Sequence, residues 1–266
     1  MKKKKAIIFG ITGQDGSYLA RLLIIKGYKV FGVTRSGNNK NLINLIKLKI
    51  RNKITLKVNK SSSKNEIYQF IKKISPNEIY YLAGQSSVNI SFNKPVETYV
   101  SNNLTLFYIL EFCRFFNKKI KIYNSASSEC FGNNKKIFCN EKTKFNPISP
   151  YGKAKSFGFW LVKYYRENFQ LKASNGILFN HESPLRKKQF VTQKIINYAN
   201  NYNKRKKKIL LGNTRIRRDW GWANDYVEMM YKINSNKKND DYVIGSGKHK
   251  SLLEFIKIIF EKKKFH

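Results

Sequence analysis

Cysteine and histidine are scarce in this sequence, and their scarcity excludes several kinds of site. The three cysteines, Cys113, Cys130 and Cys139, form no Cys-X-X-Cys pair and are odd in number. We therefore expect neither a disulfide framework nor a cysteine zinc site, and we expect a reducing compartment. The three histidines stand too far apart along the chain for a local metal motif, so we predict that the protein binds no metal.

Long apolar runs are missing as well. No stretch approaches the ~20 apolar residues that a membrane-spanning helix requires, and the apolar segment after Lys2–Lys5 is too short for a signal peptide. Yet 41% of the 266 residues are hydrophobic and 14% are aromatic, which is enough for a packed core in one or two domains. We therefore expect a cytoplasmic globular protein without a membrane partner.

Acidic residues are few, and the excess of basic residues needs an interpretation. The chain carries 16 Asp+Glu against 53 Lys+Arg, a formal net charge of +37. A nucleic-acid-binding surface concentrates Arg and Lys on one face or in one segment. Here Lys is scattered through the whole chain, with short runs at Lys2–Lys5, Lys204–Lys208 and Lys262–Lys264. We interpret the excess as compositional drift on solvated faces and predict no nucleic-acid partner.

Short β-branched runs alternate with longer amphipathic stretches, which is typical of βαβ units and a parallel sheet. One such stretch, Tyr18–Ile25, has the apolar spacing of a helix. We predict an α/β fold with a doubly wound parallel sheet of the Rossmann type. The expected strands are Ala6–Phe9, Lys29–Val33, Ile54–Val58, Glu78–Leu82 and Lys121–Tyr123.

Beyond about residue 180 the pattern becomes less regular, and no internal repeat is visible. We predict that residues 1–178 form the cofactor-binding core, including the catalytic residues. Residues 179–266 are expected to form a smaller substrate lobe, interleaved with the core and truncated at its C-terminal end.

A glycine-rich turn, Gly10-Ile-Thr-Gly13-Gln-Asp-Gly16, joins the first expected strand to the first expected helix. Glycines at these positions let the backbone turn tightly and approach a pyrophosphate, which then rests on the helix N-terminus. An ordinary glycine-rich turn is the alternative interpretation. The turn predicts a dinucleotide cofactor.

Arg35 follows the second expected strand, where an Asp or Glu would bind the 2′-hydroxyl of an adenosine ribose. An acidic residue would repel a 2′-phosphate, whereas a guanidinium pairs with it. We therefore predict NADP rather than NAD as the cofactor. A surface arginine in a basic chain is the alternative.

Tyr151 and Lys155 lie one helical turn apart, at the start of a helix announced by Ser149-Pro150. In that arrangement the lysine can lower the pKa of the phenol and contact the nicotinamide ribose. The same Tyr/Lys spacing occurs at Tyr68 and Tyr202. The position of Tyr151, just beyond the fifth expected strand, is what selects it.

Ser127 and Glu129 end the fifth expected strand, in Ser125-Ala-Ser127-Ser128-Glu129. The carboxyl end of such a strand faces the cofactor, so both side chains should point towards the substrate. Ser127 can then hydrogen-bond a substrate hydroxyl beside Tyr151, and Glu129 supplies an acid and base. A strand-end cap is the alternative role for Ser127.

These motifs resemble those of the GDP-mannose 4,6-dehydratase family, a branch of the extended short-chain dehydrogenases/reductases, or NAD-dependent epimerase/dehydratase family. The most diagnostic string is Asn175-Gly-Ile-Leu-Phe-Asn-His-Glu-Ser-Pro184. The similarity covers essentially the whole chain through further segments at 10–19, Leu82-Ala-Gly-Gln-Ser86, Phe190-Val-Thr, Leu211-Gly-Asn and Arg217–Tyr226.

The resemblance implies a lyase of nucleotide-sugar metabolism that converts GDP-mannose to GDP-4-keto-6-deoxymannose by intramolecular hydride transfer through NADP and loss of water. Tyr151 would take the proton of the carbon-4 hydroxyl. Glu129 would remove the carbon-5 proton and serve as general acid for the water that leaves carbon 6. Ser127 and Lys155 would orient the sugar and the cofactor ribose.

The resemblance also implies two sets of binding residues and a homo-oligomer that associates near Arg35. In the substrate set, Asn180 and Arg218 would contact the diphosphate, while Phe190 and Val191 would line the pocket. A solvated charge is the alternative for Arg218, although a guanidinium suits a diphosphate. The cofactor set is Gly10, Thr12, Gly13, Gln14, Asp15, Gly16, Arg35, Leu82, Ala83, Ser86, Tyr151, Lys155 and His181. The substrate set is Ser86, Glu129, Asn180, Phe190, Val191, Lys194, Gly212, Asn213 and Arg218.

Several positions depart from the family pattern. Ser127 replaces a Thr, Val58-Asn59-Lys60 stands where an Asp-Leu pair is usual, and Trp222 replaces a His. The sequence stops inside a helical pattern that begins near Ser251, whereas family members continue. Two alternatives therefore stay open: another nucleotide-sugar epimerase, dehydratase or reductase, and a catalytically compromised NADP-binding paralogue.

Overall fold

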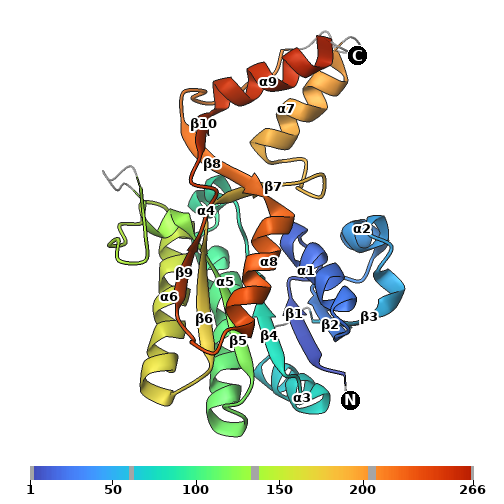
Figure 1. The fold of residues 1–266 in the computed structure, drawn as a ribbon, viewed down its shortest axis with the longest axis vertical. Helices are drawn as coiled ribbons and strands as arrows, with labels where there is room; N and C mark the ends of the chain where they lie inside the picture. The colour runs from blue at the N-terminus through green and yellow to red at the C-terminus, as the bar shows by residue number, and fades with distance from the viewer. Residues whose placement is uncertain (1–2, 60–62, 133–137, 203–207, 265–266) are drawn as a thin grey trace.

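A computed structural model describes residues 3–59, 63–132, 138–202 and 208–264 of the chain (Figure 1). Its centre is a sheet of seven parallel strands in the order β3-β2-β1-β4-β5-β6-β9. These strands are β1 (Lys5–Phe9), β2 (Lys29–Thr34), β3 (Ile54–Val58), β4 (Glu78–Tyr81), β5 (Lys121–Ser127), β6 (Ala173–Leu178) and β9 (Asp241–Ile244). The prediction of a doubly wound parallel sheet is confirmed.

Helices cover both faces of the sheet, which explains the nearly unbroken apolar runs of its strands. Ala6 and Ile8 of β1 face one layer, and Ile7 and Phe9 face the other, with none of the four more than 2% exposed. The first layer contains α1 (Gln14–Ile25), α2 (Asn39–Lys47) and α8 (Ala223–Ser235). The second contains α3 (Lys64–Ile74), α5 (Pro95–Phe116) and α6 (Pro150–Phe169).

The remaining elements form short connections and a smaller lobe, drawn above the core in Figure 1. The lobe is a three-stranded sheet in the order β10-β8-β7, accompanied by two helices that pack on each other. Its elements are β7 (Asn180–Glu182), α7 (Val191–Asn200), β8 (Arg217–Trp222), β10 (His249–Ser251) and α9 (Leu252–Lys264). The short connecting helices are η1 (Arg51–Lys53), α4 (Val88–Asn93) and η2 (Ser128–Cys130).

The part of the chain after residue 178 contributes to both bodies. Strand β9 extends the core sheet beside β6, and α8 packs on α1 against the sheet. After β6 the chain enters the small lobe with β7, α7 and β8 and returns to the core with α8 and β9. It then enters the lobe again with β10 and α9 (Figure 1).

A buried ion pair fastens the returning strand to the core. Arg166 of α6 donates to both carboxylate oxygens of Asp241 in β9, at 2.9 and 2.7 Å, and also donates to the carbonyl of Ala173. Asn175 of β6 donates to Asp241 at 2.8 Å and accepts from Asn124 of β5 at 2.8 Å. One polar network therefore crosses β5, β6 and β9.

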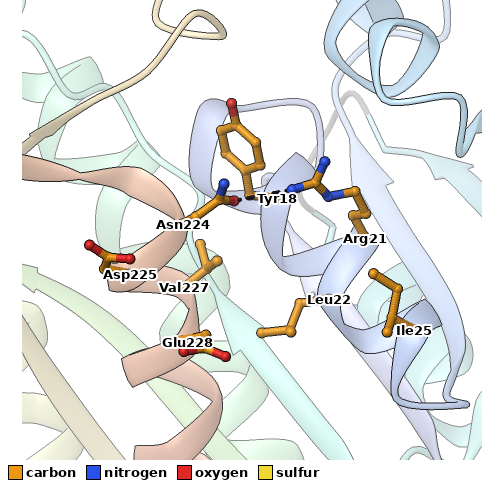
Figure 2. Close-up of a pocket in the computed structure, with 8 residues that line it drawn as sticks. All are labelled: Tyr18, Arg21, Leu22, Ile25, Asn224, Asp225, Val227 and Glu228. Carbon is orange, nitrogen blue, oxygen red and sulfur yellow. Dashed lines mark hydrogen bonds between the residues drawn. The ribbon is translucent and has the colours of Figure 1, made fainter.

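A small pocket of about 200 Å³ lies between α1 and α8 (Figure 2). Arg21 and Asn224 approach across it, with 3.5 Å between the Arg21 Nη2 and the Asn224 Oδ1. The helical face expected over Tyr18–Ile25 is buried at Leu19 and Leu23, but Ile25 borders this pocket and is 75% exposed. None of the residues predicted to be catalytic lines it.

Candidate active site

The glycine-rich turn lies at the carboxyl end of β1, next to the end of β4. Gly10 has a φ of +84°, and a Cβ there would lie 2.8 Å from the carbonyl of Leu82. A Cβ on Gly16 would lie 2.3 Å from the carbonyl oxygen of Gly10. Both positions therefore require glycine. They bring the turn against β4 where the strand order reverses direction, the place where open α/β sheets bind ligands.

The turn presents the N-terminus of α1. Gly13 is the N-cap and has no side chain to cap the helix; its own N–H donates to Gly10 at 3.0 Å. The first N–H groups of a helix have no partner within the helix, and the helix dipole favours an anion there. Backbone and glycines together thus fit the pyrophosphate of a dinucleotide.

The side chains of Gln14 and Asp15 are engaged by the segment that starts at β7. Gln14 donates to the carbonyl of His181 at 3.2 Å and accepts from Ser183 at 2.8 Å. Asp15 lies 2.9 Å from the Nε2 of His181. The carbonyl of Thr12 accepts from Asn44 at 3.2 Å. These contacts leave the backbone of the turn, rather than its side chains, to meet a cofactor.

Arg35 directly follows β2 and is exposed. The neighbouring turn is held by two bonds of Thr34: its hydroxyl donates to the carbonyl of Ser36 at 3.0 Å, and its own carbonyl accepts from Asn59 at 2.9 Å. Since β2 pairs directly with β1, the guanidinium stands at the same edge of the sheet as the glycine-rich turn. That is the side from which an adenosine ribose would be reached.

Tyr151 and Lys155 lie in the first turns of α6, as the sequence predicts. Ser149 caps the helix by accepting from Gly152 at 3.0 Å, and Pro150 occupies its first position. The Nζ of Lys155 donates to the carbonyl of Ser125 at 2.8 Å and lies 5.9 Å from the centre of the Tyr151 ring. Helix α6 therefore fixes both side chains against the carboxyl end of β5.

Burial controls the protonation of this pair. It raises the pKa of Tyr151 above its ordinary value, while a hydrogen bond with Ser127 and the charge of Arg186 act in the opposite direction. Burial also lowers the pKa of Lys155 to about 8. The sequence predicts that Lys155 lowers the pKa of the phenol, and that role stays a prediction. In the structure Ser127 and Arg186 offset part of the rise that burial causes.

Ser127 has two roles at the end of β5. Its oxygen accepts from the N–H of Glu129 at 3.2 Å, which is the capping role considered as an alternative. Its side chain also acts on Tyr151 and lowers the pKa of that phenol. The cap and the contact with the phenol are compatible because a hydroxyl can both donate and accept.

Glu129 lies in η2, next to the start of α6. A Cβ at Gly152 would be 2.6 Å from the backbone oxygen of Glu129, so glycine allows the closest approach of these two segments. The carboxylate is half-buried, and its charge is one of the causes that raise the pKa of Tyr151. A carboxylate and a phenol therefore share one site.

The segment Leu82–Ser87 follows β4 and is shaped by Gln85, which the sequence did not single out. Gln85 donates to the carbonyl of Ser87 at 2.8 Å and to Thr98 at 3.2 Å, and its amide oxygen accepts from the N–H of Ser87. Asn102 of α5 donates to the carbonyl of Gln85 at 3.0 Å. This network leaves Ser86 exposed and Leu82 and Ala83 half-buried at the sheet edge.

The predicted substrate residues lie on the smaller lobe. Asn180 opens β7 and pairs in register with Trp220 of β8, two residues beyond Arg218. Phe190 precedes α7, and the guanidinium of Arg186 lies 3.8 Å from the centre of its ring. Along this lobe the structure leaves several predicted residues exposed: Val191, Lys194, Gly212, Asn213 and Arg218.

Arg186 is a residue that sequence reasoning missed. It lies between Phe190 and Glu182, with 3.6 Å between its Nε and a Glu182 oxygen, and its charge lowers the pKa of Tyr151. The signal was its place two residues after Pro184 of the diagnostic string. It brings a cation between the catalytic residues and the substrate lobe.

The described residues contain no cluster of three or more His, Cys, Asp or Glu side chains able to hold a metal ion. Within that same part of the chain, none of the helices combines the length and apolar character needed to cross a membrane. Of the cysteines, Cys113 and Cys130 are buried and Cys139 is half-buried.

Comparison with known proteins identifies the family. A family model described as GDP-mannose 4,6 dehydratase matches residues 7–265. GDP-mannose 4,6 dehydratase 2 of Caenorhabditis elegans is 41% identical over 97% of this chain and 70% of its own length. The GDP-mannose 4,6 dehydratase of Homo sapiens is 39% identical over 96% of this chain and 71% of its own.

Solved structures share the fold at lower identity. UDP-glucose 4-epimerase of Thermotoga maritima, solved with UDP-glucose, superposes with a TM-score of 0.86 at 21% identity, covering 98% of this chain and 83% of its own. dTDP-glucose 4,6-dehydratase of Bacillus anthracis, solved with NAD, has a TM-score of 0.82 at 20% identity, covering 97% and 80%. These likenesses concern the fold alone.

Proposed function

The chain belongs to the GDP-mannose 4,6-dehydratase family, and from that premise we propose that it converts GDP-mannose to GDP-4-keto-6-deoxymannose with loss of water. The observation that carries the proposal is the shared site of Tyr151 and Glu129, since their segments meet at Gly152. An alcohol oxidation alone needs the tyrosine. A dehydration also needs a group that moves protons at the neighbouring carbons, and a carboxylate can do so.

A nicotinamide cofactor fits the glycine-rich turn, and we propose NADP. The backbone of Gly10–Gly16 would hold the pyrophosphate, Arg35 the 2′-phosphate and Lys155 the nicotinamide ribose. When bound, the cofactor supplies a hydride acceptor at carbon 4 of the sugar and returns the hydride at carbon 6, so that none is consumed.

Tyr151 is the proposed base for the first step. It acts as a phenolate, takes the proton of the carbon-4 hydroxyl and becomes a neutral phenol. Ser127, which lowers the pKa of Tyr151, stabilises the phenolate before that transfer. Lys155 adds an ammonium group below its pKa of about 8. Burial, which raises the pKa of Tyr151, keeps the free phenol protonated and makes these neighbours necessary.

Glu129 is the proposed acid and base for the elimination. The new ketone at carbon 4 acidifies carbon 5, whose proton passes to the Glu129 carboxylate. The carboxylic acid then protonates the hydroxyl that leaves carbon 6 as water. Reduction at carbon 6 and return of one proton to carbon 5 balance the oxidation at carbon 4, so the net change is the loss of one water.

The direct test is product analysis. Incubation with GDP-mannose and NADP should give GDP-4-keto-6-deoxymannose by mass spectrometry, without accumulation of NADPH. A panel containing UDP- and dTDP-hexoses tests the base. Turnover of those sugars alone would point to another nucleotide-sugar enzyme, and cofactor binding without any product would point to a non-catalytic paralogue.

Glu129→Gln should stop the reaction after its first half. Removing the acid and base should slow product formation at least about a hundredfold, while oxidation at carbon 4 continues. Reduced cofactor should therefore accumulate in a single turnover, which absorbance detects. Glu97→Gln, an exposed position on α5, is the matched control and should behave like the wild type. Unchanged turnover of Glu129→Gln would remove this residue from the mechanism.

Arg35→Ala should weaken NADP binding about tenfold or more and leave NAD binding nearly unchanged, because only NADP carries the phosphate that the guanidinium would pair with. Titration of both cofactors by calorimetry measures this difference. Arg51→Ala, which removes an arginine from η1, controls for the loss of one positive charge. Equal losses for both cofactors, or a wild type that prefers NAD tenfold, would contradict the assignment of Arg35.

We also propose that the chain forms homo-oligomers through α5 and α6. These adjacent helices expose large apolar side chains, and the rings of Tyr99 and Phe157 lie 6.2 Å apart across them. Contiguous exposed apolar surface of this kind is typical of protein interfaces. The segment around Arg35 is exposed and polar by comparison. The proposed face includes Val96, Tyr99, Val100 and Phe107 of α5, and Phe157, Trp160 and Tyr164 of α6.

A further inference from the structure

Asp15 lies in an electrostatically unfavourable place for a phosphate-binding helix. It is the acidic residue in the first turn of α1, two residues beyond the Gly13 cap. The helix dipole stabilises a carboxylate at this position. The same carboxylate repels a pyrophosphate held at the N-terminus of the helix. The turn therefore needs a compensating positive charge if it is to bind a dinucleotide tightly.

His181 supplies that charge through its geometry. Its Nε2 lies 2.9 Å from Oδ1 of Asp15, and its Nδ1 lies 2.8 Å from the carbonyl oxygen of Phe179. A carbonyl and a carboxylate can only accept hydrogen bonds, so both ring nitrogens must carry hydrogen. The imidazole is buried at 7% exposure and stacks on Tyr226, with ring centres 4.3 Å apart.

Other titratable groups also surround Asp15 and His181. Arg186 and Glu182, which face each other, and Lys155 act on it through their charges. The phenols of Tyr123 and Tyr226 also face Asp15 but carry no charge near neutrality. Gln14 adds a neutral hydrogen bond to Asp15 at 3.1 Å.

We propose that His181 is a positioning residue whose extra proton neutralises Asp15 beside the cofactor's pyrophosphate, so that dinucleotide affinity falls when that proton is lost. This inference rests on the proposed cofactor. It assigns His181 an electrostatic role exerted through Asp15, and it gives a physical reason for the histidine in the diagnostic string.

The direction of the pH effect follows from the pair. Burial lowers the pKa of His181, but Asp15 and the Phe179 carbonyl together outweigh burial and leave it raised. Burial raises the pKa of Asp15, but His181, Gln14 and Arg186 together outweigh burial and hold it at about 2. Near neutral pH the pair is therefore uncharged overall. As the pH rises through the elevated pKa of His181, the pair becomes negative, and both its contribution to stability and its tolerance of the pyrophosphate are lost.

The test is a set of cofactor dissociation constants measured by calorimetry from about pH 6 to about pH 9. Wild type should lose about tenfold in affinity over this range. Asp15→Asn should lose much less, because no carboxylate remains to be neutralised. His181→Gln should bind weakly at every pH, and the double variant should recover affinity. NAD serves as the main probe because it lacks the titrating 2′-phosphate of NADP.

Two controls separate the outcomes. Lys155, with a pKa of about 8, titrates in the same range, so only the pH dependence that Asp15→Asn removes is counted. His249→Gln, an exposed histidine on β10, should leave the profile unchanged, and thermal unfolding without cofactor identifies variants that fail to fold. Parallel profiles for wild type and Asp15→Asn would overturn the inference. A wild type that binds no dinucleotide at any pH would instead contradict the proposed function.

Discussion

Tyr151→Phe should reduce turnover of GDP-mannose by about a thousandfold while dinucleotide affinity stays close to that of the wild type. Only the hydroxyl is removed, so the ring remains buried, with the Nζ of Lys155 5.9 Å from its centre. What is lost is the group that accepts the carbon-4 proton, and a positioned base contributes about a hundred- to ten-thousandfold to a rate. Steady-state product formation and calorimetric cofactor titration measure the two quantities separately.

Tyr164→Phe is the matched control for this variant. Tyr164 lies on the same helix, α6, but is 51% exposed, so loss of its hydroxyl should change neither quantity. A Tyr151→Phe enzyme that retained more than about a tenth of wild-type turnover would assign the base to another residue.

Asp241→Ala should lower the free energy of unfolding by about 3–5 kcal/mol. This is the largest loss of stability that we expect from removing one member of an ion pair in this fold. The substitution strands the Arg166 guanidinium, whose side chain is 11% exposed, without the two hydrogen bonds of 2.9 and 2.7 Å that Asp241 accepts. It also removes the acceptor of Asn175 at 2.8 Å. Urea unfolding followed by circular dichroism measures the loss.

Glu97→Ala provides the comparison for this loss. Lys94 and Glu97 form an ion pair at 3.0 Å with 57% and 68% of their side chains exposed, and such surface pairs contribute at most about 1 kcal/mol. If Asp241→Ala cost no more than Glu97→Ala, the buried network would not fasten β9 to the core as its geometry indicates.

The sequence predicts the first five strands well because β1, β2, β4 and β5 are buried on both faces, while the edge strand β3, buried only at Ile54, is marked by its β-branched residues. Residues such as Ile7 and Ile79, both 0% exposed, produce apolar runs that periodicity detects. The sequence did not delimit the later strands. β6 is buried throughout, but its first residues, Ala-Ser-Asn-Gly, break the apolar run, and β9 is only half-buried at three of its four residues. β7 and β10 have three residues each, and β8 is mostly polar, Arg217-Arg-Asp-Trp-Gly-Trp222. Such segments are strands because a neighbour supplies their hydrogen bonds, which one sequence cannot reveal.

In the candidate site, too, the residues of local motifs could be predicted from the sequence, whereas contacts between distant residues could not. The family is confirmed, and the turn, Ser127, Glu129, Tyr151 and Lys155 lie at one sheet edge, although their roles stay predictions. The contact of Asp15 with His181 joins residues 166 positions apart. The effect of Arg186 on the pKa of Tyr151 likewise arises only because folding brings two distant parts of the sequence together. Local motifs carry no record of such pairings, so the electrostatics of the site required the structure.

The place of β9 has a consequence for synthesis on the ribosome. Until residues 241–244 have been made, β6 is an open sheet edge, and until α8 follows, the face containing Ile8, Tyr80 and Tyr123 lacks one of its covering helices. A nascent chain ending near residue 178 would thus display both a bare strand edge and apolar surface, the features that promote aggregation. Completion of the core during synthesis must wait for residues 223–244, and chaperones that shield the unfinished sheet should bind it during that interval.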